Sequence, residues 1–149
     1  MEEIFLRKTV FDAYRLSNIN QYLVSWDLSP VEGKGIHLGA MHTKYGHIQI
    51  KMYKSSNQES KMIWNLTQEQ LPDEYGAKTA IKKVLEYFID YFAGIKGESI
   101  ALIFEINDGS YHPVDSQAIG YMFAAMYALI NCFDKDHIKF KEDRVWRNF

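Results

Sequence analysis

The eight residues GSYHPVDS, from Gly109 to Ser116, join two segments whose apolar patterns differ. The preceding segment, Ser99 to Asn107, is apolar at every second position and nearly so at the others, which is typical of a central β-strand. Residues 107–110 are expected to turn the chain. The alanine-rich segment from Ser116 to Cys132 predicts a helix, with Asp115 as the N-cap that accepts from the free N–H groups of the first turn.

Upstream of this connection, three further segments follow clear periods. Pro72 to Phe92 places its apolar residues on one stripe of a predicted helix, which Gly94 and Gly97 are expected to stop. His47 to Tyr53 and Met62 to Leu66 both alternate between apolar and polar residues, as half-buried strands do. A polar run separates these two strands, and we expect them to form a hairpin.

The segment before His47 has a less regular pattern of apolar and polar residues. Tyr22 to Trp26 alternates and predicts a strand, whereas Ser29 to Gly35 contains a proline and two glycines and predicts a loop. The resulting order of strands, helix, strand and helix predicts an α+β two-layer sandwich with its helices on one face of the sheet. No linker interrupts the sequence, so residues 1–149 are expected to form a single domain, with residues 134–149 as a tail.

Composition narrows the possible functions. A net charge of −2 excludes binding to nucleic acid through bulk charge, so an RNA contact requires a local patch. Cys132 is the single cysteine, which excludes an internal disulfide and suits the reducing cytoplasm. The sequence contains no GxxxxGK[ST] nucleotide-binding motif and no apolar run that could span a membrane, and Met1 to Leu6 lacks the apolar core of a signal peptide. We expect a cytoplasmic protein without cofactor, nucleotide or membrane partner.

Four motifs together resemble a known family. GSYHPVDS resembles the G-S-Y-H-x-V-D-S signature of domain IV in translational GTPases of the elongation factor G type. Lys44 to Ile48 resembles the Q-Y-G-H-V segment of that domain, and Val31 to Lys34 resembles its V-E-G-K segment. Leu71 to Tyr75 resembles its I-P-x-E-Y helix start. The motifs occur in the same order over residues 31–133, and the chain is identified as a stand-alone copy of domain IV without the GTPase domain.

This resemblance implies a fold like that of domain 2 of ribosomal protein S5, with a four-stranded antiparallel or mixed sheet and two helices on one face. In the family, two loops at the tip of domain IV contact messenger and transfer RNA on the ribosome. The resemblance implies the following RNA- or ribosome-binding candidates in this sequence: His42, Thr43, Lys44, Ser110, Tyr111 and His112.

One of the two tip loops departs from the family pattern. Residues 40–44 read AMHTK where the family has G-G-R-G-Q, so the phosphate-binding arginine is absent and His42 or Lys44 would replace it only in part. An alternative function is therefore a retained fold that binds a protein partner, in an accessory or immunity-like role. Self-association through the aromatic residues of the tail is a further alternative, and these residues are Phe140, Trp146 and Phe149.

Two other patterns resemble a metal site and a catalytic site without predicting either. His37, His42 and His47 recur every five residues, but a loop followed by a strand would point them in different directions. The HPVDS part of the connection contains a histidine, an aspartate and a serine, but adjacent residues at a helix start are poorly placed to form a triad. We therefore expect no metal ligands, no catalytic residues and no enzymatic activity.

Overall fold

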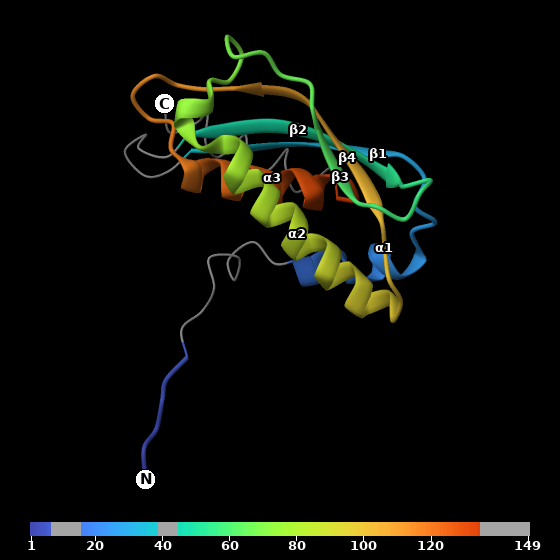
Figure 1. Ribbon diagram of the computed structural model, residues 1–149. Helices are drawn as coiled ribbons and strands as arrows, with labels where there is room; N and C mark the ends of the chain where they lie inside the picture. The colour runs from blue at the N-terminus through green and yellow to red at the C-terminus, as the bar shows by residue number, and fades with distance from the viewer. Residues whose placement is uncertain (7–15, 39–44, 135–149) are drawn as a thin grey trace.

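The computed structural model describes residues 1–6, 16–38 and 45–134 (Figure 1). The strands are β1 (Val31–His37), β2 (Gly46–Lys54), β3 (Lys61–Trp64) and β4 (Leu102–Ser110). The helices are α1 (Asn20–Ser25), α2 (Ala77–Lys96) and α3 (Ala118–Asn131), and two short 3-10 turns are η1 (Leu16–Ile19) and η3 (Asp73–Tyr75). None of the helices in the described ranges combines the length and the apolarity needed to cross a bilayer.

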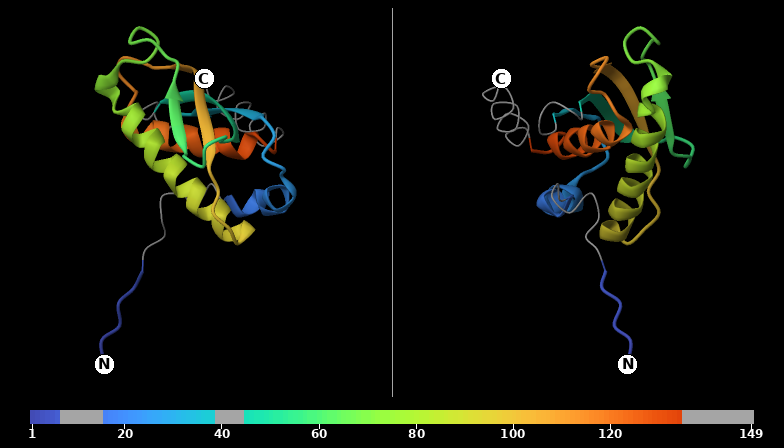
Figure 2. Two further views of the ribbon diagram at one scale, coloured as in Figure 1. Left: turned by 45° about the vertical axis from the view of Figure 1, so that its right-hand side comes forward. Right: turned by 90° about the vertical axis from the view of Figure 1, so that its left-hand side faces the viewer.

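The strands form one sheet with the order β1-β2-β4-β3. β2 pairs antiparallel with β1 and with β4, whereas β3 pairs parallel with β4, so the sheet is mixed. The long helices α2 and α3 cover one face of it, which confirms the predicted two-layer α+β fold (Figure 2). The predicted hairpin between β2 and β3 is wrong because β4 lies between them. The nearly continuous apolar pattern of β4 suits this central position, where both edges of the strand are paired.

The core lies between the sheet and the two long helices. Alternate residues of β2 and β4 face the helices and are almost fully buried: Ile48, Ile50, Met52, Leu102, Phe104 and Ile106. α2 presents its apolar stripe to them, and the rings of Phe88 and Phe104 meet edge to face with centroids 6.3 Å apart. The periods of two in these strands and of 3.6 in α2 are therefore confirmed.

The loop predicted over Ser29 to Gly35 is wrong, because most of it belongs to β1. β1 pairs along its whole length with Gly46 to Met52 of β2, and its two glycines face α3. A Cβ atom at Gly35 would lie 1.9 Å from the carbonyl oxygen of Ala124, and one at Gly33 would lie 2.1 Å from that of Ala128. The glycines thus serve a close approach of helix backbone to strand backbone rather than a turn.

The strand predicted over Tyr22 to Trp26 is also wrong, because Asn20–Ser25 forms the short helix α1. The buried side chains of this region follow a helical spacing and are Leu16, Ile19, Leu23 and Trp26. Tyr22 and Val24, which the predicted strand would have placed on its buried face, are exposed.

α2 begins and ends at glycines with left-handed backbone conformation. Gly76 has a φ of 70° and separates η3 from α2, so the helix begins later than predicted. Gly97 has a φ of 71° and its N–H donates to the carbonyl of Ala93, as at many helix C-termini. Gly94 lies inside the helix and does not stop it.

The connection between β4 and α3 differs from the prediction at both ends. β4 continues through the predicted turn to Ser110, because its last residues pair with β2 beyond an irregularity in the register at Gln49 and Ile50. α3 begins at Ala118 with Gln117 in the N-cap position, so Asp115 is not its cap. The backbone carbonyl of Asp115 instead accepts a hydrogen bond from the N–H of Tyr45.

Candidate functional site

Two chain segments meet at one end of the sheet, which we call the tip: Tyr45 to His47 and Ser110 to Ser116. The N–H of Tyr45 donates to the carbonyl oxygen of Asp115 at 2.9 Å, and Tyr45 and Ser116 form a parallel bridge. The segment that enters β2 therefore lies beside the segment that leaves β4. This confirms the prediction that the two motifs share one end of the molecule.

Ser110 connects three elements at the tip. Its hydroxyl oxygen lies 2.7 Å from the hydroxyl of Tyr45 and 2.8 Å from Nδ1 of His47. Its carbonyl oxygen accepts a hydrogen bond of 2.7 Å from the hydroxyl of Tyr121 in α3. Ser110 was predicted as a contact residue, but its side chain is directed into this network.

Ser116 fixes the conformation of the loop that follows Ser110. Its hydroxyl oxygen accepts from the N–H of His112 at 2.7 Å, and its own N–H donates to the carbonyl of His112 at 3.0 Å. The same hydroxyl lies 3.3 Å from that of Tyr121, and Ser116 is buried. These reciprocal bonds close residues 112–116 into a small loop whose outer residues are presented to solvent.

Among the predicted contact residues that the structure describes, His112 has the most accessible functional group. Its side chain is 55% exposed, and Nδ1 lies 3.3 Å from a carboxylate oxygen of Asp115. The N–H groups of Val114 and Asp115 point at the same Nδ1, at 3.4 and 3.3 Å. The neutral ring accepts these backbone donors at Nδ1 and carries its proton on Nε2, whereas the protonated ring donates to Asp115.

Tyr111 and Val114 differ in how the loop presents them. The ring of Tyr111 packs against that of Tyr75 in η3, with centroids 5.0 Å apart, and the hydroxyl of Tyr75 donates to the carbonyl of Pro113 at 3.5 Å. Tyr111 is therefore braced against the protein rather than free to stack on a base. Val114 is 81% exposed and gives the loop an apolar outer surface.

Four members of the tip network were not among the predicted site residues: Tyr45, His47, Ser116 and Tyr121. Burial lowers the pKa of His47 below its usual range, and nearby Lys34 acts in the same direction. Nε2 of His47 is buried and has no hydrogen-bond partner among the residues that the structure describes. Burial also raises the pKa of Tyr121 to about 12, so it remains a hydrogen-bond donor. A tyrosine within the apolar helix segment was the sequence signal for such a buried donor.

The structure does not describe the remaining predicted sites. His42, Thr43 and Lys44, and the tail residues Phe140, Trp146 and Phe149, lie outside the described residues.

The described histidines and acids form neither a three-residue metal cluster nor a Ser-His-Asp triad at the tip. The ring of His37 packs against Phe123 with centroids 4.5 Å apart. Within the described ranges, histidines, cysteines, aspartates and glutamates form no group of three that could hold a metal. The hydroxyl of Ser116 bonds the backbone of His112 and not its ring, so these residues do not form a triad.

Comparison with known proteins identifies relatives of this chain. No protein-family model matches the chain. Elongation factor G from Ureaplasma urealyticum serovar 10 is 31% identical over 105 residues, which cover 68% of this chain and 14% of that protein. Elongation factor G from Ureaplasma parvum serovar 3 matches with the same identity and coverage. The chain thus spans about 14% of the length of these curated relatives.

The fold is also found among solved structures. A crystal structure of a protein from Thermus thermophilus superposes with a TM-score of 0.55 and 24% sequence identity. The superposition covers 72% of this chain and 16% of that one, and it shows a shared fold. Sequence and fold together show that this chain is an elongation factor G domain IV-like protein.

Proposed function

We propose that this chain binds the ribosome, or another RNA of the translation machinery, through its tip. The observation that carries the proposal is the hydrogen bonding of Tyr45 to Asp115, which joins the two segments that bear the family motifs. The similarity to part of elongation factor G supports a role connected with translation. We place this binding in the cytoplasm, in keeping with a chain whose single cysteine, Cys132, is buried.

Some of the tip residues would contact the RNA, and others would hold the loop in shape. His112 is held by Ser116 and exposes most of its ring, so it is suited to donate to a phosphate or sugar oxygen. Ser110 and Tyr111 support the loop from inside, through the networks with His47 and Tyr75. Lys44, together with His42 and Thr43 before it in the sequence, would supply the cationic and polar contacts of the neighbouring loop.

Co-sedimentation with small ribosomal subunits at low salt tests the proposal. The full chain is expected to pellet with the subunits, and the double variant His112→Ala and Lys44→Ala to bind roughly tenfold more weakly, since each lost polar contact contributes about 0.5–1.5 kcal/mol. Binding should also weaken as salt rises, because phosphate contacts release counterions.

Lys83→Ala is the matched control, since this lysine is exposed on α2 away from the tip. The proposal is abandoned if the chain stays in the supernatant at low salt, or if Lys83→Ala weakens binding as much as the tip variants do.

A protein partner is the second candidate, and the exposed Val114 favours it. An apolar side chain that is 81% exposed at the outer end of a fixed loop suits a protein surface better than a phosphate backbone. The net charge of −2 points the same way. Under this alternative, Val114→Asp abolishes capture of the partner whereas Lys44→Ala has little effect, and added salt does not weaken the complex.

We propose a binding role rather than a catalytic one. The described part of the tip combines aromatic rings, hydroxyl groups and one exposed imidazole, but His112, Asp115 and Ser116 are not arranged for proton transfer to a nucleophile. Incubating the purified chain with GTP and measuring phosphate release tests this directly, and release above the buffer background would contradict it.

A further inference from the structure

A groove separates the edge strand β3 from helix α2, at the side of the molecule away from β1. It encloses about 550 Å³, and its apolar floor consists of Met62, Leu85, Ile89 and Phe104. Its rim carries charges of both signs, from Lys61, Lys82, Glu86 and Asp90. An apolar floor with a charged rim beside a strand edge is suited to an extended peptide with apolar side chains.

The outer edge of β3 has unpaired backbone groups. The N–H of Asn65 donates to the carbonyl of Ile106, so the alternate residues Lys61 and Ile63 also direct their backbone groups toward β4. The N–H and carbonyl groups of Met62 and Trp64 therefore point away from the sheet. Among the residues that the structure describes, none pairs with this edge of β3. Such an edge is a template for an additional strand.

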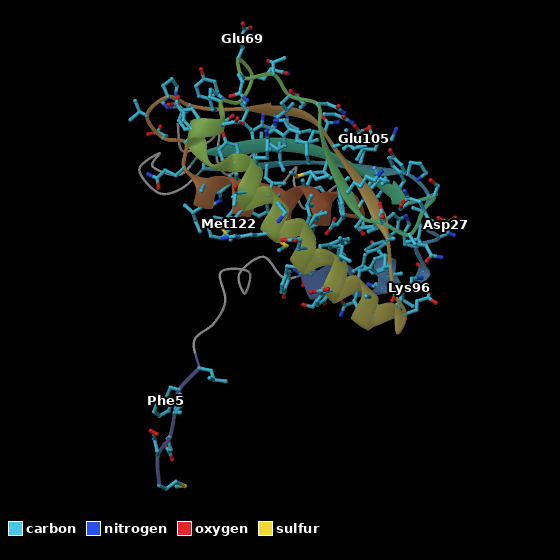
Figure 3. All side chains as sticks on the ribbon, in the orientation of Figure 1. Phe5, Asp27, Glu69, Lys96, Glu105 and Met122 are labelled. Atoms are coloured by element: carbon cyan, nitrogen blue, oxygen red, sulfur yellow. The ribbon has the colours of Figure 1, made fainter. Side chains whose placement is uncertain are left out.

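The N-terminal arm, Met1 to Leu6, has the complementary properties. It lies apart from the folded body, on the side of the helices and away from the sheet, and Figure 3 shows Phe5 projecting from it. Ile4, Phe5 and Leu6 are 77%, 86% and 91% exposed. Three consecutive apolar side chains exposed on an extended segment are costly in water, and burial against an apolar surface would stabilise them.

We propose that the arm of a second copy of this chain adds to the outer edge of β3 as a fifth strand. Side chains alternate along a strand, so Ile4 and Leu6 would enter the groove above Met62, while Phe5 would lie on the other face beside Ile63, which is 39% exposed. Each copy would lend its arm to the other, and this reciprocal exchange closes a two-fold dimer.

Charge sets the direction of the added strand. The groove is only partly positive near Trp64, because Nζ of Lys78 lies 5.3 Å from the centre of the indole ring but 3.3 Å from Asp73, and Nζ of Lys82, one turn later on α2, lies 3.6 Å from Glu86. It becomes acidic along α2 toward Glu86 and Asp90. The acidic pair Glu2 and Glu3 precedes the apolar residues of the arm, so the arm would run from the Trp64 end of β3 to the Lys61 end, antiparallel to β3.

Disulfide trapping between differently tagged copies tests this arrangement. One copy carries Phe5→Cys and the other Ile63→Cys, two exposed positions that the proposal brings together as neighbours on adjacent strands. The mixture is expected to form a cross-link that contains both tags, in high yield. The control replaces Ile63→Cys with Val114→Cys, which is more exposed and lies at the tip. Equal yields in the two mixtures would overturn the proposal.

A single chain that carries both Phe5→Cys and Ile63→Cys distinguishes exchange from internal docking. Cross-linking that depends on concentration and joins two chains supports the exchanged dimer. Cross-linking within one chain at every dilution shows that the arm occupies its own groove and overturns the proposal.

Sedimentation equilibrium of the full chain gives an independent measurement. The unmodified chain is expected to dimerise, and Ile4→Asp combined with Leu6→Asp to shift it to monomer. Val24→Asp combined with Val114→Asp adds the same two charges at exposed apolar positions outside the arm and the groove, and should leave the dimer unchanged. A monomer at all soluble concentrations of the unmodified chain contradicts the proposal.

Discussion

Ser110 and His47 show how the loop at residues 112–116 is supported by the buried side chains beneath it. Their contact at 2.8 Å links β4 to β2, and the carbonyl of Ser110 links both strands to α3 through Tyr121. The partners are partly or fully buried, where hydrogen bonds are hard for water to replace. The exposed ring of His112 is therefore displayed on a support with little freedom to move.

The burial of His47 makes the tip sensitive to acid. Burial lowers the pKa of His47 in the folded chain below the value of about 6.5 that it has when unfolded. Between these two values the unfolded chain binds more protons, so the free energy of unfolding falls as the pH drops below about 6.5. Urea unfolding at about pH 7.5 and about pH 5.5 should show this loss, and His47→Asn should make it smaller.

His112→Asn is the matched control for this measurement, since His112 is largely exposed at the same end of the molecule. If the two variants respond to pH in the same way, burial of His47 is not the cause of the acid sensitivity.

At the scale of elements, the contact between β1 and α3 depends on small residues on both sides. Gly33 and Gly35 line the strand side in β1, with Gly46 beside them in β2, and Ala128, Ala124 and Gly120 supply the opposing helix backbone. This pairing lets α3 lie directly on the strand backbone and buries the helix along almost its whole length. The alanine-rich composition of α3 is thus a requirement of the interface as well as a helix preference.

Gly35→Ala should disrupt this interface severely. The added methyl group would meet the carbonyl oxygen of Ala124 at 1.9 Å, and the neighbouring atoms are backbone that cannot rotate away. We expect a loss of at least about 3 kcal/mol in the free energy of unfolding, measured in urea. The same substitution at Gly94, where nothing lies within 4 Å of the added atom, should stabilise α2 by about 0.5–1 kcal/mol. Similar effects at the two glycines would argue against close approach as the role of Gly35.

At the scale of the whole molecule, the segment before β1 belongs to the same core as the region that matches the family. The ring of Trp26 lies 5.4 Å from that of Phe92 in α2 and 5.3 Å from that of Phe133 after α3. Nζ of Lys96 at the end of α2 donates to the carbonyls of Val24 and Trp26, at 2.9 and 3.1 Å. α1 is therefore tied to both long helices.

Trp26→Ala should consequently destabilise the entire chain. Removing a buried aromatic ring of this size typically costs about 3–5 kcal/mol. Thermal unfolding followed by circular dichroism should show a single transition at a lower temperature. Val24→Ala, at a position that is 61% exposed, should shift it little. A separate early transition in Trp26→Ala, with the main one unchanged, would show instead that α1 unfolds independently.

The position of the candidate site could largely be predicted from the sequence, but the roles of its individual side chains could not. The motifs around Tyr45 and His112 were correctly expected to share one end of the molecule, as the bond from Tyr45 to Asp115 shows. The roles of Ser110 and Ser116 as supports, and the membership of Tyr121, depend on which side chains meet across β2, β4 and α3. No local pattern records such contacts between residues that are far apart in the sequence.

The sequence by itself determined β2, β4, α2 and α3, because the apolar period of two in the strands and of 3.6 in α2 can each be buried by only one type of element, and because α3 is an alanine-rich run. The tertiary structure alone decided that Gly33 and Gly35 lie in a strand, that Asp115 joins two segments of the tip and that β4 separates β2 from β3. The physical reason is the distance along the chain between the residues that decide each feature. Periodicity reports what one segment buries, whereas glycine conformation, cap usage and strand order are set by whichever distant backbone comes to lie against that segment.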